Sequence, residues 1–189
     1  MKSRDSFLAH YFLDGKQGVE IGGSAHNPFN IPGCKNVDYT DDMTTIFKQH
    51  EIETCGEAMK VDIVADGAHL PFGENSLDYI VSSHVIEHFY DPIEVLEHWM
   101  KIIRPGGYVF AIVPHKDRTF DSPRPCTTLE ELIERHAHPD IAEAQREKHH
   151  SVWRTEDFLA LCKHLNLNVV SVQDIDDKVG NGFTVVIRK

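Results

Sequence analysis

The chain has 189 residues, of which 19 are Lys or Arg and 30 are Asp or Glu, so its formal net charge is -11. A chain of this length can bury a substantial core and fits one domain, residues 1–189. The acidic balance argues against a protein whose affinity comes from neutralising phosphates. Neither nucleic acid nor an anionic membrane is therefore an expected partner.

Two further classes of protein are disfavoured. No apolar run approaches the length of a membrane span, and the first residues, MKSRDSFLAHYFLDG, carry charges where a signal peptide would be apolar. The 4 cysteines show no CxxC spacing, which favours reduced thiols over a disulfide framework or a cysteine metal site. We expect a cytoplasmic protein.

The first elements in chain order are a short helix and a short strand. A helix is predicted over Asp5–Leu13, ended by Gly15, with four apolar residues on one face: Phe7, Leu8, Tyr11 and Phe12. The strand Gly18–Ile21 then runs into GGSAHNPFNIPG. Gly22 and Gly23 let a ligand approach the backbone there, although an ordinary tight turn fits this pattern equally well.

A second strand is predicted over Asn36–Tyr39. Asp38 near its end could accept hydrogen bonds from the vicinal hydroxyls of a ribose, or be a solvated loop residue. Pro28 and Pro32 leave little room for a helix between the two strands, so we expect an irregular crossover. A helix over Met43–Thr54 follows, with its inward face formed by Met43, Ile46, Phe47 and His50.

The central stretch, Val61 to Pro114, organises the rest of the chain. Its apolar runs predict three strands buried on both faces: Val61–Ala65, Tyr79–Ser82 and Tyr108–Val113. A helical pattern from Ile93 to Ile103, stopped by RPGG, separates the last two strands. A helix between two strands implies parallel pairing, and ligands bind beyond the carboxyl ends of such strands.

A long polar segment, about 115–152, follows the third of these strands. It contains a predicted helix over Thr128–His136, opened by a capping box of Thr127 and Glu130, and a second predicted helix from Pro139 to Lys148. Insertions of this length at the ligand end of a sheet are usually lids or binding loops, so we expect this one to choose the substrate. Thr155 then caps a helix that continues to Leu165.

The last two predicted strands separate one α/β fold from another. Asn168–Gln173 and Phe183–Ile187 are joined by DIDDKVGNG, which is too short and polar for a crossover helix. The two strands should therefore pair antiparallel. A mostly parallel sheet that ends in an antiparallel hairpin is not the usual nicotinamide-binding arrangement.

Four motifs together resemble class I S-adenosylmethionine-dependent methyltransferases, in particular the small-molecule, type 11-like branch. The motifs are GVEIGG, NVDY, ADGAHLPFGENSLDYIVSSHVIEH and RPGGYV, and the resemblance covers Gly18 to Val113. It implies a single Rossmann-like α/β methyltransferase domain with a mostly parallel, seven-stranded sheet. It also implies S-adenosyl-L-methionine as the cofactor and a small polar molecule as the methyl acceptor.

The resemblance also assigns roles to residues at the strand ends. It places Asp38 on the ribose and Asp66 on the adenine amine. The full set implied to bind the cofactor is Glu20, Gly22, Gly23, Asp38, Tyr39, Asp66, Gly67, Ala68, Ser83, His84 and Val85. One departure stands out, because Ser24 and His26 occupy positions where the family usually has glycine. A side chain at either position narrows the cofactor cradle unless the backbone takes another path.

Histidines are the candidate catalytic bases for an oxygen acceptor, since histidine titrates near neutral pH, whereas an amine needs only to arrive neutral. The candidates are His88, His115, His149 and His150, with His115 and His150 preferred by position. Any one of them could equally be an ordinary solvated side chain. Trp153 could be a wall of the acceptor pocket or part of the core.

Two rival interpretations come from other classes of protein. Histidines in HAH, at 136–138, and in HH, at 149–150, could bind zinc or nickel, although neither pair has the spacing of a zinc hydrolase. Alternatively, the altered first loop could belong to a module that binds the cofactor without transferring its methyl group. The sequence predicts no metal site among its primary assignments.

Overall fold

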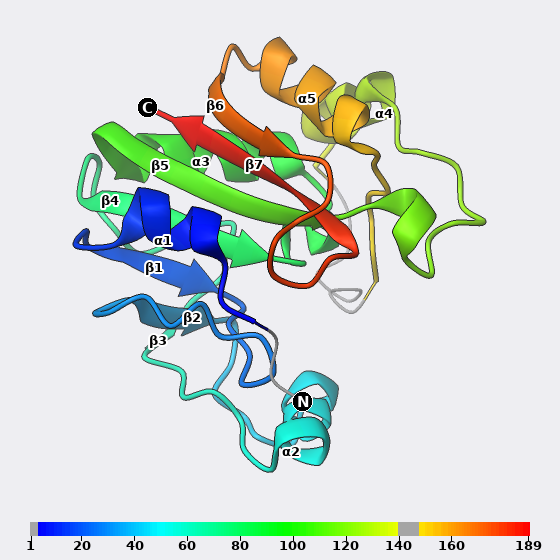
Figure 1. The fold of residues 1–189 in the computed structure, drawn as a ribbon. Coiled ribbons are helices and arrows are strands. Elements are labelled where there is room, and N and C mark those ends of the chain that lie inside the picture. Colours follow the sequence, from blue (N-terminus) through cyan, green and yellow to red (C-terminus); the bar gives the residue numbers. More distant parts are fainter. Residues whose placement is uncertain (1–3, 140–147) are drawn as a thin grey trace.

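A seven-stranded sheet forms the centre of the computed structural model, which describes residues 4–139 and 148–189. The strand order is β3-β2-β1-β4-β5-β7-β6 (Figure 1). The strands are β1 Gly18–Ile21, β2 Lys35–Asp38, β3 Ile63–Val64, β4 Leu77–Ser83, β5 Ile103–Pro114, β6 Asn168–Gln173 and β7 Gly182–Arg188. Strands β1 to β5 pair in parallel, whereas β7 runs antiparallel to both β5 and β6. The predicted fold, a mostly parallel sheet ending in an antiparallel hairpin, is confirmed.

Helices cover both faces of this sheet (Figure 1). They are α1 Phe7–Leu13, α2 Ile46–Cys55, α3 Pro92–Ile102, α4 Leu129–Ala137 and α5 Thr155–His164, with short 3-10 turns η1 Ile86–His88 and η2 Lys116–Arg118. The segment between β1 and β2 has only turns, as its prolines predict. Within the described residues, none of the helices is long and apolar enough to cross a membrane.

Strand β5 shows how the two faces are filled. Its alternate residues Val109, Ala111 and Val113 pack in the cluster that includes α3 and α5, whereas Phe110 and Ile112 pack in the cluster that includes α1. Successive side chains of a strand point to opposite faces. A strand with helices on both sides is therefore apolar at every position, which explains the continuous run in the sequence.

Two predictions of which side chains are buried were wrong, one in α1 and one in β3. Helix α1 buries Ala9 and Leu13, while Phe7 and Tyr11, predicted to face inward, are 79% and 72% exposed. Strand β3 lies at the edge of the sheet with β2 as its neighbour, and Val64 is 55% exposed. An edge strand has packing on one side only, so the apolar run of 61–65 does not report burial on both faces.

The inward face of α2 was also predicted wrongly. Ile46 is 63% exposed and Phe47 and Met43 are exposed, whereas the charged residues Lys48 and Glu51 are buried. Figure 1 shows α2 set apart from the sheet. The helix therefore covers polar loops at the ends of the strands, and its buried face carries charge.

Smaller differences concern element ends in the second half. Strand β5 begins at Ile103, so RPGG belongs to the strand and does not end the helix. The capping box of α4 uses Thr128 and Glu131, one residue later than predicted. Thr155 is the first residue of α5 and not its cap. The second predicted helix of the insertion falls mainly on 140–147, outside the described residues.

Candidate functional site

A cavity of about 820 Å³ lies at the carboxyl ends of β1, β2, β3 and β4. Parallel strands place these ends at one edge of the sheet, which is where α/β folds bind ligands. All the residues that the resemblance assigns to the cofactor line it: Glu20, Gly22, Gly23, Asp38, Tyr39, Asp66, Gly67, Ala68, Ser83, His84 and Val85. Residues that are far apart in the sequence therefore meet around one space.

The first loop requires glycine at two positions. Gly22 has φ +64°, and a Cβ atom there would lie 2.8 Å from Cγ2 of Val85. A Cβ on Gly23 would lie 2.7 Å from both Oδ1 of Asn36 and Sδ of Met59. These contacts are too short for a side chain, so the backbone itself forms this wall of the cavity.

The same loop shows how the chain accommodates Ser24 and His26. The Ser24 hydroxyl and Nδ1 of His26 are 2.6 Å apart, so these two side chains hydrogen-bond to each other. Between them, the amide of Ala25 donates to Oε2 of Glu51 at 3.0 Å. A hydrogen bond to a carboxylate from α2 thus fixes the position of this loop, instead of the close packing that glycines would allow.

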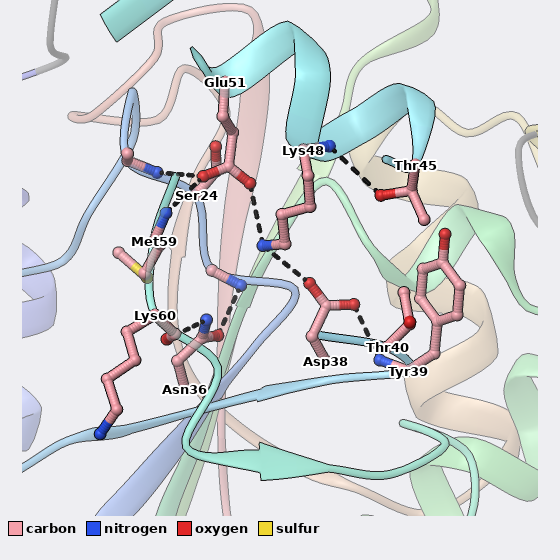
Figure 2. Close-up of polar contacts among 12 residues, drawn as sticks. Ser24, Asn36, Asp38, Tyr39, Thr40, Thr45, Lys48, Glu51, Met59 and Lys60 are labelled. Carbon is pink, nitrogen blue, oxygen red and sulfur yellow. Dashed lines mark hydrogen bonds and ion pairs between the residues drawn. The ribbon is translucent and has the colours of Figure 1, made fainter. Parts of the chain in front are cut away.

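Lys48 lies between Asp38 and Glu51, the residue that supports the first loop (Figure 2). Its ammonium is 3.0 Å from Oε1 of Glu51 and 3.1 Å from Oδ2 of Asp38, and its side chain is only 2% exposed. Burial alone would lower the pKa of Lys48, but hydrogen bonds and charge interactions with these two carboxylates raise it above its usual value. The other Asp38 oxygen accepts from the Tyr39 amide at 2.7 Å. The predicted ribose acceptor is therefore held in one orientation by a contact at each carboxylate oxygen.

The loop after β3 is tied to α3. Oδ1 of Asp66 accepts from the Ala68 amide at 2.9 Å. The indole nitrogen of the buried Trp99 donates to the carbonyl of Gly67 at 2.7 Å. A Cβ atom on Gly67 would lie 2.8 Å from the Phe89 ring. The peptide predicted to contact the adenine ring is therefore also packed too closely to carry a side chain.

Glu20 and Lys178, an acidic and a basic residue, both line the cavity. Burial raises the pKa of Glu20 to about 7, against the lowering effect of the Lys178 charge. Lys178 donates from Nζ to the carbonyl of Pro28 at 2.6 Å and lies 4.5 Å from the centroid of the Phe29 ring. Lys178 was not predicted as a site residue, because the sequence of its loop indicates only the connection of a hairpin.

The end of β4 places two polar residues, Ser83 and His84, beside the first loop. The Ser83 hydroxyl accepts from the amide nitrogen of Asn27 at 3.2 Å. His84 has φ +55°, an uncommon conformation for a residue with a side chain, and burial lowers its pKa to about 4. His84 is therefore a neutral imidazole at neutral pH.

The candidate histidine bases separate into two groups. His88 and His150 line the cavity, and the ring centroids of His150 and Tyr90 are 5.7 Å apart. His115, one of the two preferred candidates, is buried outside the cavity lining, where its Nδ1 accepts from the Asp117 amide at 3.1 Å. Its position directly after β5 led to the prediction. The structure does not bring His115 together with His88 and His150 at the cavity wall.

Trp153 is part of the core. It is 1% exposed, its ring packs edge-on to Phe158, and its backbone bridges to His115. Of the two roles left open by the sequence, the structure therefore favours anchoring the end of the insertion to the sheet.

The strand order and the cavity at the strand ends define a Rossmann-like domain of the methyltransferase type. Residues 7–172 match the family described as Methyltransferase domain. The chain belongs to this family and carries a class I S-adenosylmethionine-dependent methyltransferase domain, as its motifs predict. Its cofactor is S-adenosyl-L-methionine.

Individual relatives are more distant. An uncharacterised protein of Methanocaldococcus jannaschii is 27% identical over 119 residues, which are 61% of this chain and 53% of that protein. A ubiquinone biosynthesis O-methyltransferase of Hydrogenovibrio crunogenus is 26% identical over 81 residues, 43% of this chain and 32% of that protein. The match thus spans about half or less of these curated relatives.

The solved structures agree on the fold. A methyltransferase of Aquifex aeolicus, described as SAM dependent, has a TM-score of 0.57 and 16% identity, with 95% of this chain and 86% of that chain covered.

Proposed function

We propose that this chain catalyses methyl transfer from S-adenosyl-L-methionine to an oxygen or nitrogen atom of a small polar acceptor. The observation that carries this proposal is that the predicted cofactor residues and two histidines, His88 and His150, line the same cavity. The cofactor and the acceptor would then share one space closed by the protein.

The cavity wall suits the cofactor at several points. Gly22, Gly23 and Gly67 are packed too closely to carry side chains, so their peptides are exposed to a ligand. Asp38 offers a fixed carboxylate to a ribose diol, and Asp66, which lines the same cavity, is our proposed acceptor for the exocyclic amine. When bound, the cofactor supplies a methyl group already activated by a positively charged sulfur.

The remaining work of the protein is to place the acceptor and remove water from it. Alignment of two bound reactants can contribute several kcal/mol to lowering the barrier without a covalent step. The cavity is also lined by His88 of η1, by Tyr90 between η1 and α3, and by His150 of the insertion. We assign the acceptor to this end, where either histidine can accept a proton from an oxygen acceptor.

Calorimetry with S-adenosylhomocysteine tests the cofactor end. Asp38→Ala and Asp66→Ala should each weaken binding by about tenfold or more, since each variant loses a net hydrogen-bond pair. Asp78→Asn is the matched control, because Asp78 pairs with Arg104 and does not line the cavity. Unchanged affinity in folded Asp38 and Asp66 variants would remove both residues from the site.

A transfer assay tests the reaction itself. The protein is incubated with S-adenosylmethionine and a panel of small hydroxylated and amine compounds, and methylated products are detected by mass spectrometry. Binding of the cofactor without any methylated product across the panel would instead support a module that holds the cofactor without transfer.

A further inference from the structure

Glu87 is a buried carboxyl group that the cofactor site does not explain. Its side chain has no exposed surface, and neither carboxyl oxygen has a hydrogen-bond partner among the described residues. An ionised carboxylate is costly to bury unless a cation or hydrogen-bond donors compensate it. The residue lies in η1, directly after the strand end that lines the cavity.

Two imidazoles face this carboxyl group. Nε2 of His88 and Nε2 of His149 each lie 3.8 Å from Oε1 of Glu87. The two rings meet edge to face with centroids 4.7 Å apart. One ligand atom from each of the three residues lies within 4.8 Å of the others.

The orientation of His149 is fixed by another carboxylate. Its Nδ1 is 2.6 Å from Oδ2 of Asp121, which is 2% exposed and is also paired with Arg124 at 2.6 Å. A carboxylate accepts the proton of Nδ1, which leaves the lone pair of Nε2 directed at Glu87. Histidines that bind metals usually have such an outer carboxylate.

Backbone hydrogen bonds hold the two segments together. The carbonyl of Glu87 accepts from the amides of His150 and Ser151, at 2.7 and 3.2 Å. Arg124 donates to the carbonyl of His149 at 2.8 Å. The histidine of the insertion is therefore set against η1 by contacts that do not involve its ring.

We propose that Glu87, His88 and His149 bind a divalent transition-metal ion, with Asp121 as the positioning residue for His149. Two imidazoles and one carboxylate, without thiolates, suit zinc, iron(II) or manganese. Ligand atoms about 2.1 Å from a tetrahedral zinc ion are ~3.4 Å apart. The two distances from Glu87 to the imidazoles, both 3.8 Å, would have to contract slightly, and the three ligand atoms, which lie within 4.8 Å of one another, would have to draw together around the ion.

The role of this ion rests on the proposed function. Of the three proposed ligands, His88 lines the cavity at the proposed acceptor end, so we infer that the acceptor would reach the ion beside His88. A bound ion lowers the pKa of a hydroxyl that coordinates it. The methyl acceptor that fits is therefore a molecule that coordinates the ion through oxygen, such as a vicinal diol or a hydroxy acid. His88 then acts as a metal ligand instead of a base.

Metal analysis tests the site without any transfer assay. Untagged protein purified without chelator should contain about one equivalent of transition metal, and chelator-treated protein should bind one Zn²⁺ in calorimetry with a rise in Tm. Glu87→Gln and His149→Asn should abolish this binding. Asp121→Asn should weaken it about 10- to 100-fold. His138→Asn is the control, because His138 is exposed and its imidazole pairs with Glu134 on the surface.

Two results would overturn the inference. The first is wild-type protein that neither contains metal nor binds Zn²⁺, Mn²⁺ or Fe²⁺. The second is metal binding that survives in folded Glu87→Gln and His149→Asn proteins. S-adenosylhomocysteine binding, measured in parallel, separates this site from the proposed function. Cofactor binding without metal refutes the metal site alone, and metal binding without cofactor refutes the transfer proposal alone.

Discussion

Lys48→Met is the sharpest test of how the cofactor end is held. The substitution keeps an unbranched side chain, one atom shorter, and removes the ammonium that lies between Asp38 and Glu51. Removing one partner of a buried ion pair costs about 3–5 kcal/mol, because the remaining charge is left uncompensated. Glu51 keeps its hydrogen bonds from the Ala25 and Met59 amides, at 3.0 and 2.7 Å. We therefore expect the lower end, about 3 kcal/mol, which is about 6–12 °C in Tm for a chain of this size.

The assay is urea unfolding followed by tryptophan fluorescence, since Trp99 and Trp153 are both buried. Adding Glu51→Gln to Lys48→Met should recover part of the loss, because one of the two opposed carboxylates is then neutral. Lys60→Met is the matched control: its pair with Asp62 at 2.7 Å is as short, but Lys60 is exposed, so no measurable change is expected. A loss below about 1 kcal/mol for Lys48→Met, or no recovery in the double variant, would refute the reasoning.

Three further predictions concern the cavity wall. Gly23→Ala should cost about 1–3 kcal/mol and weaken S-adenosylhomocysteine binding in calorimetry, because the new Cβ would lie 2.7 Å from Asn36, whereas Gly73→Ala, with nothing within 4 Å, should do neither. Trp99→Phe leaves the Gly67 carbonyl without its donor and should lower the free energy of unfolding by about 1–3 kcal/mol in urea titration. Burial raises the pKa of Glu20 from 4.5 to about 7, so wild-type stability falls as pH rises through this range, and urea titrations of Glu20→Gln across it should show a smaller fall.

The sequence predicted the sheet because its strands are apolar for a physical reason. Parallel strands with helices on both faces read as uninterrupted Val and Ile runs, as at 108–113, and their polar ends mark the ligand edge. The residues predicted to bind the cofactor came instead from the resemblance to the family, whose motifs stand at the strand ends. What failed was the inward face of α2, since apolar periodicity cannot reveal a helix whose buried side chains are Lys48 and Glu51.

Contacts between distant segments were also beyond prediction. His149 was one of several histidines in a polar insertion, and no spacing in the chain connects it to Glu87 or Asp121. Likewise, the support of Ala25 by Glu51 depends on how α2 crosses the first loop. Single-chain patterns report which face of an element is apolar, whereas these pairs depend on how elements separated by at least 26 residues meet.

Buried charge is compensated differently at the two proposed ends of the cavity. At the cofactor end, Asp38 and Glu51 share the ammonium of Lys48, so the charges are compensated by the chain itself and the site is formed before a ligand arrives. At the proposed acceptor end, the described part of the chain sets two imidazoles beside Glu87, and each becomes a cation only by taking up a proton. An ion supplied from outside would complete this end as Lys48 completes the other, and the occupancy measured in the purified protein decides whether it does.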